Sequence, residues 1–332
     1  MEIIIDQRIE CLAVIQTLCG YWDNFAQKYM KKSHFKCEYI DEVKKHFEKY
    51  KEHETLKLFN HLCKENPDIS HYFQFVLILG CSELPELNSI TNYYDDYSYK
   101  FSQENNWKTF VDSMKIFYEE TNFKYFFESN KNEYEKIISD FGDINKTNSK
   151  YIFDYLDVKD NNNYKVIISP LIMGLYGIAI KINETEKVNY PIMSPNDYQN
   201  NKYIYDYGES INHILWHEIG HTVINDLTDK YIKEFDIENL NVPEKIKNIG
   251  YIGKTVINEY IIRAITYKLI ELFEDDNSAI FQLELEAKFG FTEIKKIKTF
   301  IEKNCEENNK LLKDESYKKL INYVINILNN ID

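Results

Sequence analysis

The segment NHILWHEIGHTVIN, residues 212–225, holds three of the eight histidines of the chain. Its apolar residues predict a strongly buried helix, and Ser210 just before it is a good N-cap residue. Residues four apart lie on one face of a helix, so His213, His217 and His221 form a stripe along it. Burying several polar side chains in such a helix is costly unless something satisfies them, and a bound metal ion would do so.

The middle of this segment, His217-Glu218-Ile219-Gly220-His221, matches the pattern HExxH. Two imidazoles one helical turn apart can both reach one zinc ion at about 2.0–2.1 Å, and the glutamate between them points at a metal-bound water. Zinc lowers the pKa of that water, and the carboxylate takes its proton as the water attacks a carbonyl. The pattern therefore predicts one zinc ion per chain, with Glu218 as the general base. The alternative is an ordinary pair of core histidines.

A catalytic zinc ion needs a third protein ligand and an open position. Two residues are candidates for that ligand. His213 continues the histidine stripe, and Glu259 stands in the otherwise apolar stretch VINEYIIR, residues 256–263. An unpaired carboxylate in such a stretch would be expensive to bury, which favours a metal-binding role for Glu259.

The two segments together resemble the gluzincin superfamily of thermolysin-like zinc metallopeptidases, in which HExxH on one helix is followed by Asn-Glu on the next. The resemblance implies that His217, His221 and Glu259 hold the zinc ion. It leaves His213 to support the site or to pack beside it. The chain departs from the superfamily pattern at Arg263, where thermolysin-like enzymes have an aspartate. Support for a zinc-bound histidine must therefore come from another residue.

Two more residues are candidates for supporting roles. Asn225 lies four residues after His221 on the same face, so it is placed to orient that imidazole by a hydrogen bond. Tyr251 lies in the glycine-flanked turn before the Glu259 helix. Thermolysin-like enzymes carry a tyrosine there that stabilises the oxyanion, so the resemblance implies this role for Tyr251. The competing tyrosines are Tyr176, Tyr205 and Tyr260.

The chain has only two arginines, Arg8 and Arg263, but 38 lysines. A guanidinium binds carboxylates bidentately in a way that an ammonium group cannot. We expect Arg263 to pair with Asp6 or Glu10, which would dock the N-terminus onto the site. The alternatives are that it receives a substrate carboxylate or forms an ordinary structural salt bridge.

Beyond these motifs, the whole chain is similar to a bacterial family of unknown function whose members are suspected to be metallopeptidases. The similarity covers most of residues 6–264 and implies no substrate. The pieces that carry it are Asp6-x-Arg8-x-Glu10, VIISPL, YGIAI, YPIMSP, HEIGHTVIN and NEYIIRA.

The order of periodic segments indicates the fold class. Residues 22–148 have apolar residues at helical spacing almost throughout, and strand-like segments follow between residues 164 and 193. Helices return at Ser210 and continue to the end of the chain. This segregation predicts a mainly helical α+β fold rather than a parallel βαβ sheet.

The length of 332 residues suggests roughly two domains. We expect a mainly helical region over residues 1–150 and a zincin-like catalytic region with C-terminal helices over residues 151–332. A small mixed or antiparallel sheet should lie beside the HExxH helix. Zincins bind peptides by adding them to the edge of such a sheet, and Val166–Ile180 is the candidate edge. The alternative is a sheet that only supports the helix.

Charge and composition disfavour several classes of partner. The net charge is -14, and the lysines are interleaved with carboxylates, as in KNEYEK and EIKKIK. Binding of nucleic acids or anionic membranes needs clustered basic residues, so we expect neither partner. Apolar runs such as FVLILGC are far too short to span a membrane.

Cysteine usage and the first residues indicate the compartment. The six cysteines form no CxxC pair, and the segment MEIIIDQRIE lacks the basic region of a signal peptide. We therefore expect a cytoplasmic protein with reduced thiols. The abundance of Lys, Asn, Ile and Tyr indicates an AT-rich genome, and we expect a bacterial source.

The function that these features favour is hydrolysis of a peptide or amide bond by a zinc-activated water, with a peptide or protein as substrate. Glu218 would act as the base and then as the proton donor to the leaving amine. The alternatives are a zinc-stabilised interaction module without catalysis, a zinc hydrolase of non-peptide amides, and a protease that acts on one partner protein.

Overall fold

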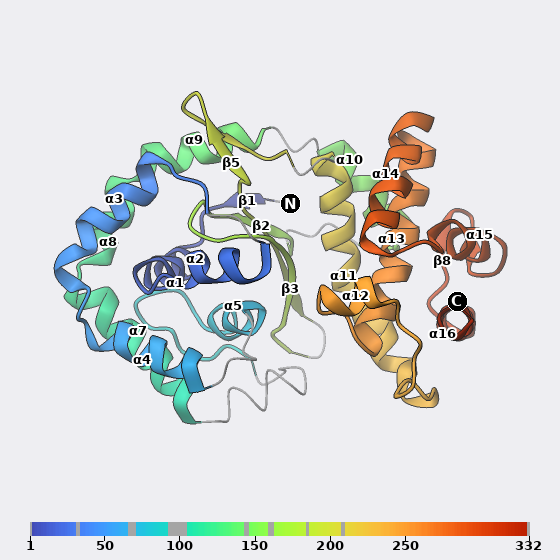
Figure 1. Ribbon diagram of the computed structural model, residues 1–332, viewed down its shortest axis with the longest axis horizontal. Helices are drawn as coiled ribbons and strands as arrows, with labels where there is room; N and C mark the ends of the chain where they lie inside the picture. The colour runs from blue at the N-terminus through green and yellow to red at the C-terminus, as the bar shows by residue number, and fades with distance from the viewer. Residues whose placement is uncertain are drawn as a thin grey trace. The chain divides into compact units, whose positions relative to one another are not determined.

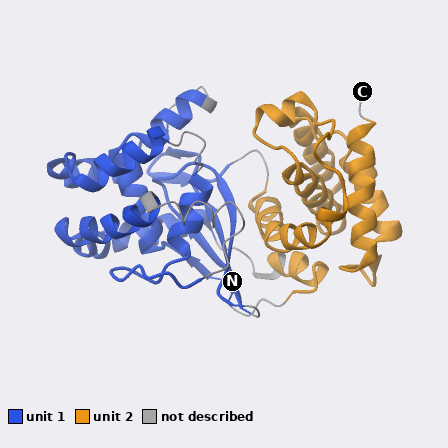
Figure 2. Ribbon diagram, turned by 90° about the horizontal axis from the view of Figure 1, so that it is seen from below, with its two compact units in different colours: residues 1–143, 161–207 blue, residues 144–160, 208–332 orange. Residues whose placement is uncertain are grey.

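The structure is a computed structural model that describes residues 2–30, 34–65, 71–91, 105–142, 146–158, 163–183, 186–206 and 210–330 (Figure 1). The chain divides into two compact units (Figure 2). Unit 1 consists of Met1–Asp143 and Asn161–Tyr207, and unit 2 consists of Ile144–Asp160 and Gly208–Asp332. Helices dominate both units and the sheets are small, so the predicted α+β, mainly helical class is confirmed.

Unit 1 combines helices with a four-stranded sheet and a two-stranded hairpin. The strands of the sheet are β1 (Glu2–Ile4), β2 (Lys165–Ile168), β3 (Leu175–Lys181) and β4 (Lys187–Met193), and the hairpin is formed by β5 (Asp197–Gln199) and β6 (Lys202–Ile204). The helices are α1 (Gln7–Leu18), α2 (Tyr21–Phe25), η1 (Ala26–Met30), α3 (Glu38–Phe47), η2 (Glu48–Tyr50), α4 (Glu54–Glu65), α5 (His71–Leu79), α7 (Asn105–Glu120), α8 (Phe123–Ser129) and α9 (Lys131–Phe141).

The core of unit 1 is built around α1, which contacts α2, α3, α4, α5 and α7. Asp6 caps this helix, because its side chain accepts hydrogen bonds from the backbone of Arg8 and Ile9. The helix is buried almost along its whole length, including three polar residues. One of them, Gln16, binds Gln74 of α5 at 2.8 Å. Such pairing offsets the cost of burying these groups.

The sheet of unit 1 is mixed, with the strand order β1-β2-β4-β3. β1 runs parallel to β2, β2 runs parallel to β4, and β3 is antiparallel to β4. The candidate peptide-binding segment Val166–Ile180 therefore contains an interior strand, β2, and a strand at the edge of the described sheet, β3. Only β3 has an edge to offer, and α5 packs against that strand.

This division of the chain differs from the one that the sequence predicts. The expected boundary at residue 150 falls inside α10 (Lys146–Tyr155), and the four-stranded sheet belongs to the unit of the N-terminal helices. The physical reason is strand pairing over a long sequence separation. Glu2 at the start of the chain pairs with Lys165, and no local pattern reveals such a pairing.

Unit 2 is formed by helices and one short hairpin among its described residues. The helices are α10, α11 (Ile211–Tyr231), η3 (Ile232–Glu234), α12 (Glu244–Asn248), α13 (Lys254–Phe273), α14 (Asp276–Phe289), α15 (Ile294–Asn304) and α16 (Glu315–Asn329). The hairpin pairs β7 (Glu306–Glu307) with β8 (Lys310–Leu311).

The centre of unit 2 is α13, which packs against α11, α14, α15 and α16. Its residues Val256 to Ile262 are all buried. α11 begins after Ser210, whose hydroxyl accepts a hydrogen bond from the Asn212 backbone, as the sequence predicts. The two helices meet closely at Gly220, where a Cβ atom would lie 3.2 Å from Cγ2 of Ile262. This contact brings the HExxH face of α11 next to α13.

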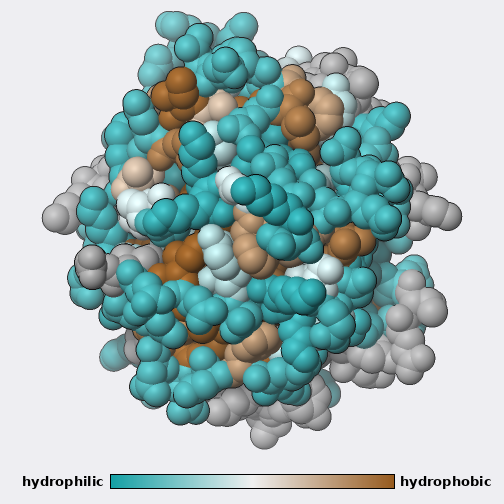
Figure 3. All heavy atoms as spheres, turned by 90° about the vertical axis from the view of Figure 1, so that its right-hand side faces the viewer, coloured by the Kyte–Doolittle hydropathy of each residue, from teal (hydrophilic) through white to brown (hydrophobic). Residues whose placement is uncertain are grey.

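The lysines that alternate with carboxylates in the sequence form ion pairs at the surface. In the EIKKIK segment, Lys296 binds Glu293 at 2.6 Å, and Lys298 binds Glu271 of α13 at 2.5 Å. The face shown in Figure 3 is mainly hydrophilic, with apolar side chains in small separate patches. Among the described residues, no helix is both long and apolar enough to cross a membrane.

Candidate metal centre

Two histidines of α11 face the same direction, one helical turn apart. The Nε2 atoms of His217 and His221 are 3.1 Å apart, and the ring centroids are 4.8 Å apart. Both side chains are 16% exposed, so the pair is sheltered without being sealed from solvent. This is the arrangement that the four-residue spacing predicts for a helix.

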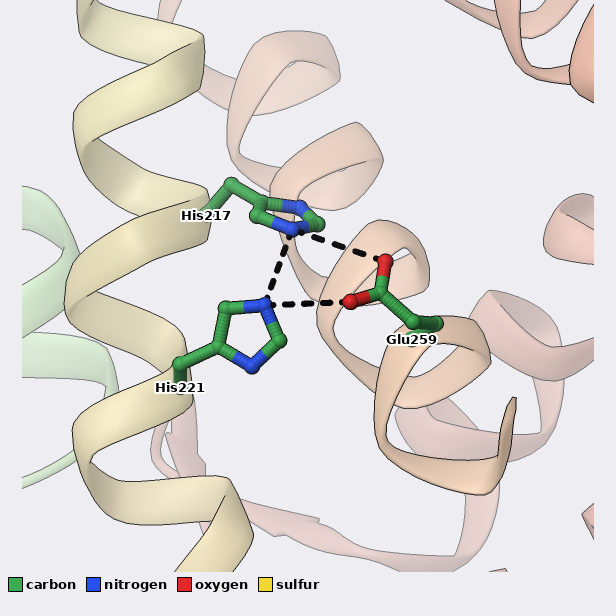
Figure 4. Close-up of side chains that lie close together, drawn as sticks. All are labelled: His217, His221 and Glu259. Carbon is green, nitrogen blue, oxygen red and sulfur yellow. Dashed lines mark hydrogen bonds and ion pairs between the residues drawn. The ribbon is translucent and has the colours of Figure 1, made fainter. Parts of the chain in front are cut away.

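Glu259 of α13 completes the cluster from the opposite side (Figure 4). Its Oε1 atom lies 3.2 Å from Nε2 of His221, and its Oε2 atom lies 3.6 Å from Nε2 of His217. One donor atom from each residue lies within 4.8 Å of the others, which is close enough for one metal ion to bind all three. Two imidazole nitrogens and one carboxylate are a donor set that zinc accepts.

Burial and charge set the protonation of the cluster. Burial lowers the pKa of His217 well below its usual value. Burial alone would raise the pKa of Glu259, but the Arg263 guanidinium and the hydrogen bond with His221 outweigh it and hold that pKa well below its usual range. For His221, burial lowers the pKa, but Glu259 reverses the direction and raises it. A neutral imidazole and an ionised carboxylate are the forms that bind metals.

Asn225 lies beside His221 on α11, as the sequence predicts. Its Oδ1 atom is 3.3 Å from Nδ1 of His221. With the proton on Nδ1, His221 donates to Asn225 and keeps the lone pair of Nε2 for a metal ion bound in the cluster. Such a contact fixes the tautomer and the ring orientation of a metal-binding histidine.

Arg263 contacts two carboxylates of unit 2. Its Nε and Nη2 atoms donate to Oε2 of Glu259 at 3.0 and 2.8 Å, and its Nη1 atom donates to Oε2 of Glu286 at 2.5 Å. The expected pairing with Asp6 or Glu10 is therefore wrong, because those residues have partners near them in unit 1.

Asp6 caps α1 and binds the side chain of Arg8 through Oδ2 at 2.7 Å. Glu10 accepts a hydrogen bond from the hydroxyl of Tyr39 at 2.7 Å. The motif Asp6-x-Arg8-x-Glu10 is thus an internal feature of unit 1. An arginine four residues after a glutamate on a helix reaches it without any distant partner, which is why Arg263 binds Glu259.

His213 lies on the stripe but outside the cluster of three donors. Its Nε2 atom pairs with Oε2 of Glu274 at 2.7 Å, and its ring lies 5.8 Å from that of Trp216. Of the two candidates for the third ligand, Glu259 is the one that lies with His217 and His221.

Glu218 is only 6% exposed and lies between the two histidines in the sequence of α11. Its negative charge contributes to raising the pKa values of both His221 and Tyr251, so it lies in the electrostatic field of the same site.

Tyr251 is half-buried in the turn before α13. Its pKa is raised, first by the negative charge of Glu259 and then by burial, while Arg263 opposes the shift. The hydroxyl therefore stays protonated at neutral pH and can donate a hydrogen bond. Tyr260 is fully buried against Phe291, so it cannot reach a substrate.

The two remaining tyrosine candidates, Tyr176 and Tyr205, belong to unit 1. The hydroxyl of Tyr176 donates to the carbonyl of Met173 at 2.5 Å, and that of Tyr205 donates to the carbonyl of Ile137 at 3.4 Å. Of the four tyrosines, Tyr251 is the one that is partly accessible and whose pKa is raised by the negative charge of Glu259.

Three residues near the site were not found from the sequence: Gln282, Glu286 and Phe291. Gln282 donates to Oε1 of Glu286 at 3.0 Å, and the guanidinium carbon of Arg263 lies 4.3 Å from the centre of the Phe291 ring. The sequence signal was the four-residue spacing of Gln282 and Glu286 in α14. Such a polar pair is typical of any solvated helix face.

Comparison with known proteins places the chain in one family and adds no function. No curated protein and no solved structure matches it. The family described as a domain of unknown function, DUF4932, matches residues 1–327, which is nearly the whole length. The chain therefore belongs to the DUF4932 family.

Proposed function

We propose that the protein is a zinc-dependent metallopeptidase that hydrolyses a peptide or amide bond. The observation that carries the proposal is the convergence of His217, His221 and Glu259 from two helices, with Glu218 between the two histidines. A purely structural metal site has no need of a carboxylate base at that position. The resemblance to gluzincins supports the same assignment.

His217, His221 and Glu259 would hold the zinc ion. Three protein ligands are what a catalytic site uses, because the fourth position stays open for water or substrate. A bound zinc ion acidifies a water molecule and polarises the carbonyl group of a substrate. The donors suit this role, since the carboxylate is ionised and Asn225 directs the His221 lone pair into the cluster.

Two side chains, those of Glu218 and Tyr251, would transfer or donate the protons that the reaction needs. Glu218 takes a proton from the attacking water and returns it to the leaving amine, as a positioned carboxylate does in general acid–base catalysis. Tyr251 donates a hydrogen bond to the oxygen that becomes negative in the transition state. Its raised pKa keeps the required proton on the hydroxyl at neutral pH.

The first experiment measures zinc and cleavage in the same preparations. Zinc content is determined by mass spectrometry on the wild type, Glu259→Ala and Glu218→Gln after loading and dialysis, and each is incubated with a diverse peptide library. We expect about one zinc ion per chain in the wild type and in Glu218→Gln, and little in Glu259→Ala. Cleavage by the wild type, with no cleavage by Glu259→Ala or Glu218→Gln, would support the proposal.

Other outcomes point to the other functions. Full zinc content without cleavage of peptides or of small amides would indicate a zinc-stabilised interaction module or a protease that acts on one partner protein. Cleavage of small amides alone would indicate a hydrolase of non-peptide amides. A wild type that takes up no zinc would contradict the proposal. Glu306→Gln serves as the control, because it removes a part-buried carboxylate that pairs with Lys268 of α13 and Tyr155 of α10 rather than with the cluster.

A further inference from the structure

Arg263 connects the candidate zinc ligand Glu259 to a second carboxylate, that of Glu286 on α14. Nε and Nη2 of the guanidinium donate to Oε2 of Glu259, and Nη1 donates to Oε2 of Glu286. The side chains of Glu259 and Glu286 are 4% and 3% exposed, so water screens these interactions little. The three groups therefore act as one buried electrostatic unit.

The guanidinium of Arg263 binds an oxygen that the cluster also needs. Oε2 of Glu259 faces His217 at 3.6 Å and receives two hydrogen bonds from Arg263. A positive charge at this place attracts the carboxylate and repels a cation bound to it. Glu286 balances that charge, because its Oε2 atom accepts a hydrogen bond from Nη1 of the same guanidinium.

Glu286 is itself held in a defined position. Gln282, one turn earlier on α14, donates to its Oε1 atom at 3.0 Å. Gly290 follows the last residue of α14 and has a φ of 104°, and the next residue, Phe291, packs its ring against the Arg263 guanidinium. A side chain at residue 290 would be strained at this φ, and its Cβ would lie 3.1 Å from side-chain atoms of Lys245 and Ile246. The hydrogen bond from Gln282 and the turn at the end of α14 therefore hold Glu286 and Phe291 beside the Arg263 guanidinium.

We propose that Glu286 is a positioning residue of the metal centre that sets its zinc affinity through Arg263. Glu286 touches none of the three ligands. It acts by neutralising and orienting the guanidinium, so that Glu259 keeps its charge available for the cation. The inference rests on the proposed zinc site and adds α14 to the elements that determine it.

The test is the zinc dissociation constant, measured by competition with a chromophoric chelator on the full-length protein. Glu286→Gln keeps the shape of the side chain and removes its charge. We expect zinc affinity to fall by about 10- to 100-fold, the usual effect of losing a partner of a metal ligand. Glu286→Asp, which keeps the charge, should retain most of the affinity.

A second variant separates this role from a general loss of stability. Gln282→Met keeps every charge and frees one oxygen of Glu286, so we expect zinc affinity to fall by about fivefold, the worth of one hydrogen bond. The control Glu306→Gln removes the partner that binds Lys268 at 2.5 Å and should lower the melting temperature of the metal-free protein without changing zinc affinity.

Each result decides for or against the inference. Weaker binding in Glu286→Gln and Gln282→Met, with normal binding in Glu306→Gln, supports it. A wild type that binds zinc while Glu286→Gln and Gln282→Met bind it equally well overturns this inference and leaves the metal site intact. Equal weakening in Glu306→Gln also overturns it, because the effect would then come from stability. A wild type that binds no zinc overturns both this inference and the proposed function.

Discussion

His213 and Glu259 show how residue type alone leaves a ligand set open. Both are polar groups within apolar helices, and both are buried. Their contacts in the fold distinguish the two residues, because the His213 side chain pairs with Glu274, whereas the Glu259 side chain pairs with His217 and His221. The spacing within α11 could not distinguish these outcomes, since the partner of His213 lies just after α13 and Glu259 lies on α13 itself.

His213→Ala tests this distinction at the residue scale. We expect the variant to keep one zinc ion per chain, because the imidazole lies outside the cluster of donors. It should lose about 2 kcal/mol of stability, since a buried hydrogen bond to Glu274 is removed. Zinc content by mass spectrometry and denaturant unfolding check the two expectations. Loss of zinc in this variant, with zinc retained in Glu259→Ala, would make His213 the third ligand.

The elements that carry the site are α11 and α13, and their separation is set where they touch. Gly220 lies within HExxH, one residue before His221, and it faces Ile262 of α13. A glycine in a helix interior costs about 1 kcal/mol relative to alanine. The close approach explains why the absence of a side chain is useful here.

Gly220→Ala tests this contact at the element scale. The added methyl gains helix propensity but presses on Ile262 from 3.2 Å, so we expect a net loss of about 1 kcal/mol in stability. The two helices would move apart and the distance from His221 to Glu259 would grow, which lowers zinc affinity. Adding Ile262→Ala makes room and should restore part of the affinity in a double-mutant cycle. Unchanged zinc affinity in Gly220→Ala would show that this contact does not set the ligand geometry.

At the scale of the whole molecule, the acidic chain still buries charged and polar groups in its cores. Glu10 in α1 is fully buried, and burial raises its pKa to about 7 against the lowering effect of hydrogen bonds from Tyr39 and Ser169. In the unfolded chain this carboxyl has its ordinary pKa. The folded form therefore prefers the protonated acid, and stability is lost as the pH rises from the unfolded pKa through about 7.

Glu10→Gln should remove this loss. We expect the variant to be more stable than the wild type at pH 8, by at most about 3 kcal/mol, and to differ little from it at pH 5. Denaturant unfolding of unit 1 at the two pH values, followed by a probe such as the fluorescence of the buried Trp22, measures the difference. A variant that is less stable at both pH values would show that the charge of Glu10 is favourable in the fold.

The sequence by itself determined what lies within one helix or one turn of it. The period of the helix places His217, Glu218, His221 and Asn225 together, and the buried carboxylate of Glu259 stands out because apolar residues surround it. The α+β class follows in the same way from the order of periodic segments. These features depend on local geometry and on the cost of burying polar groups, both of which can be read along the chain.

Only the tertiary structure decided the partners between segments that are far apart. It paired β1 with β2, which assigns the sheet to unit 1 rather than to the unit with HExxH. It brought Glu286 of α14 to Arg263 of α13, where the sequence had predicted Asp6 or Glu10 as the partner. The physical reason is that long-range contacts arise from the packing of whole elements, which leaves no period or spacing in the sequence.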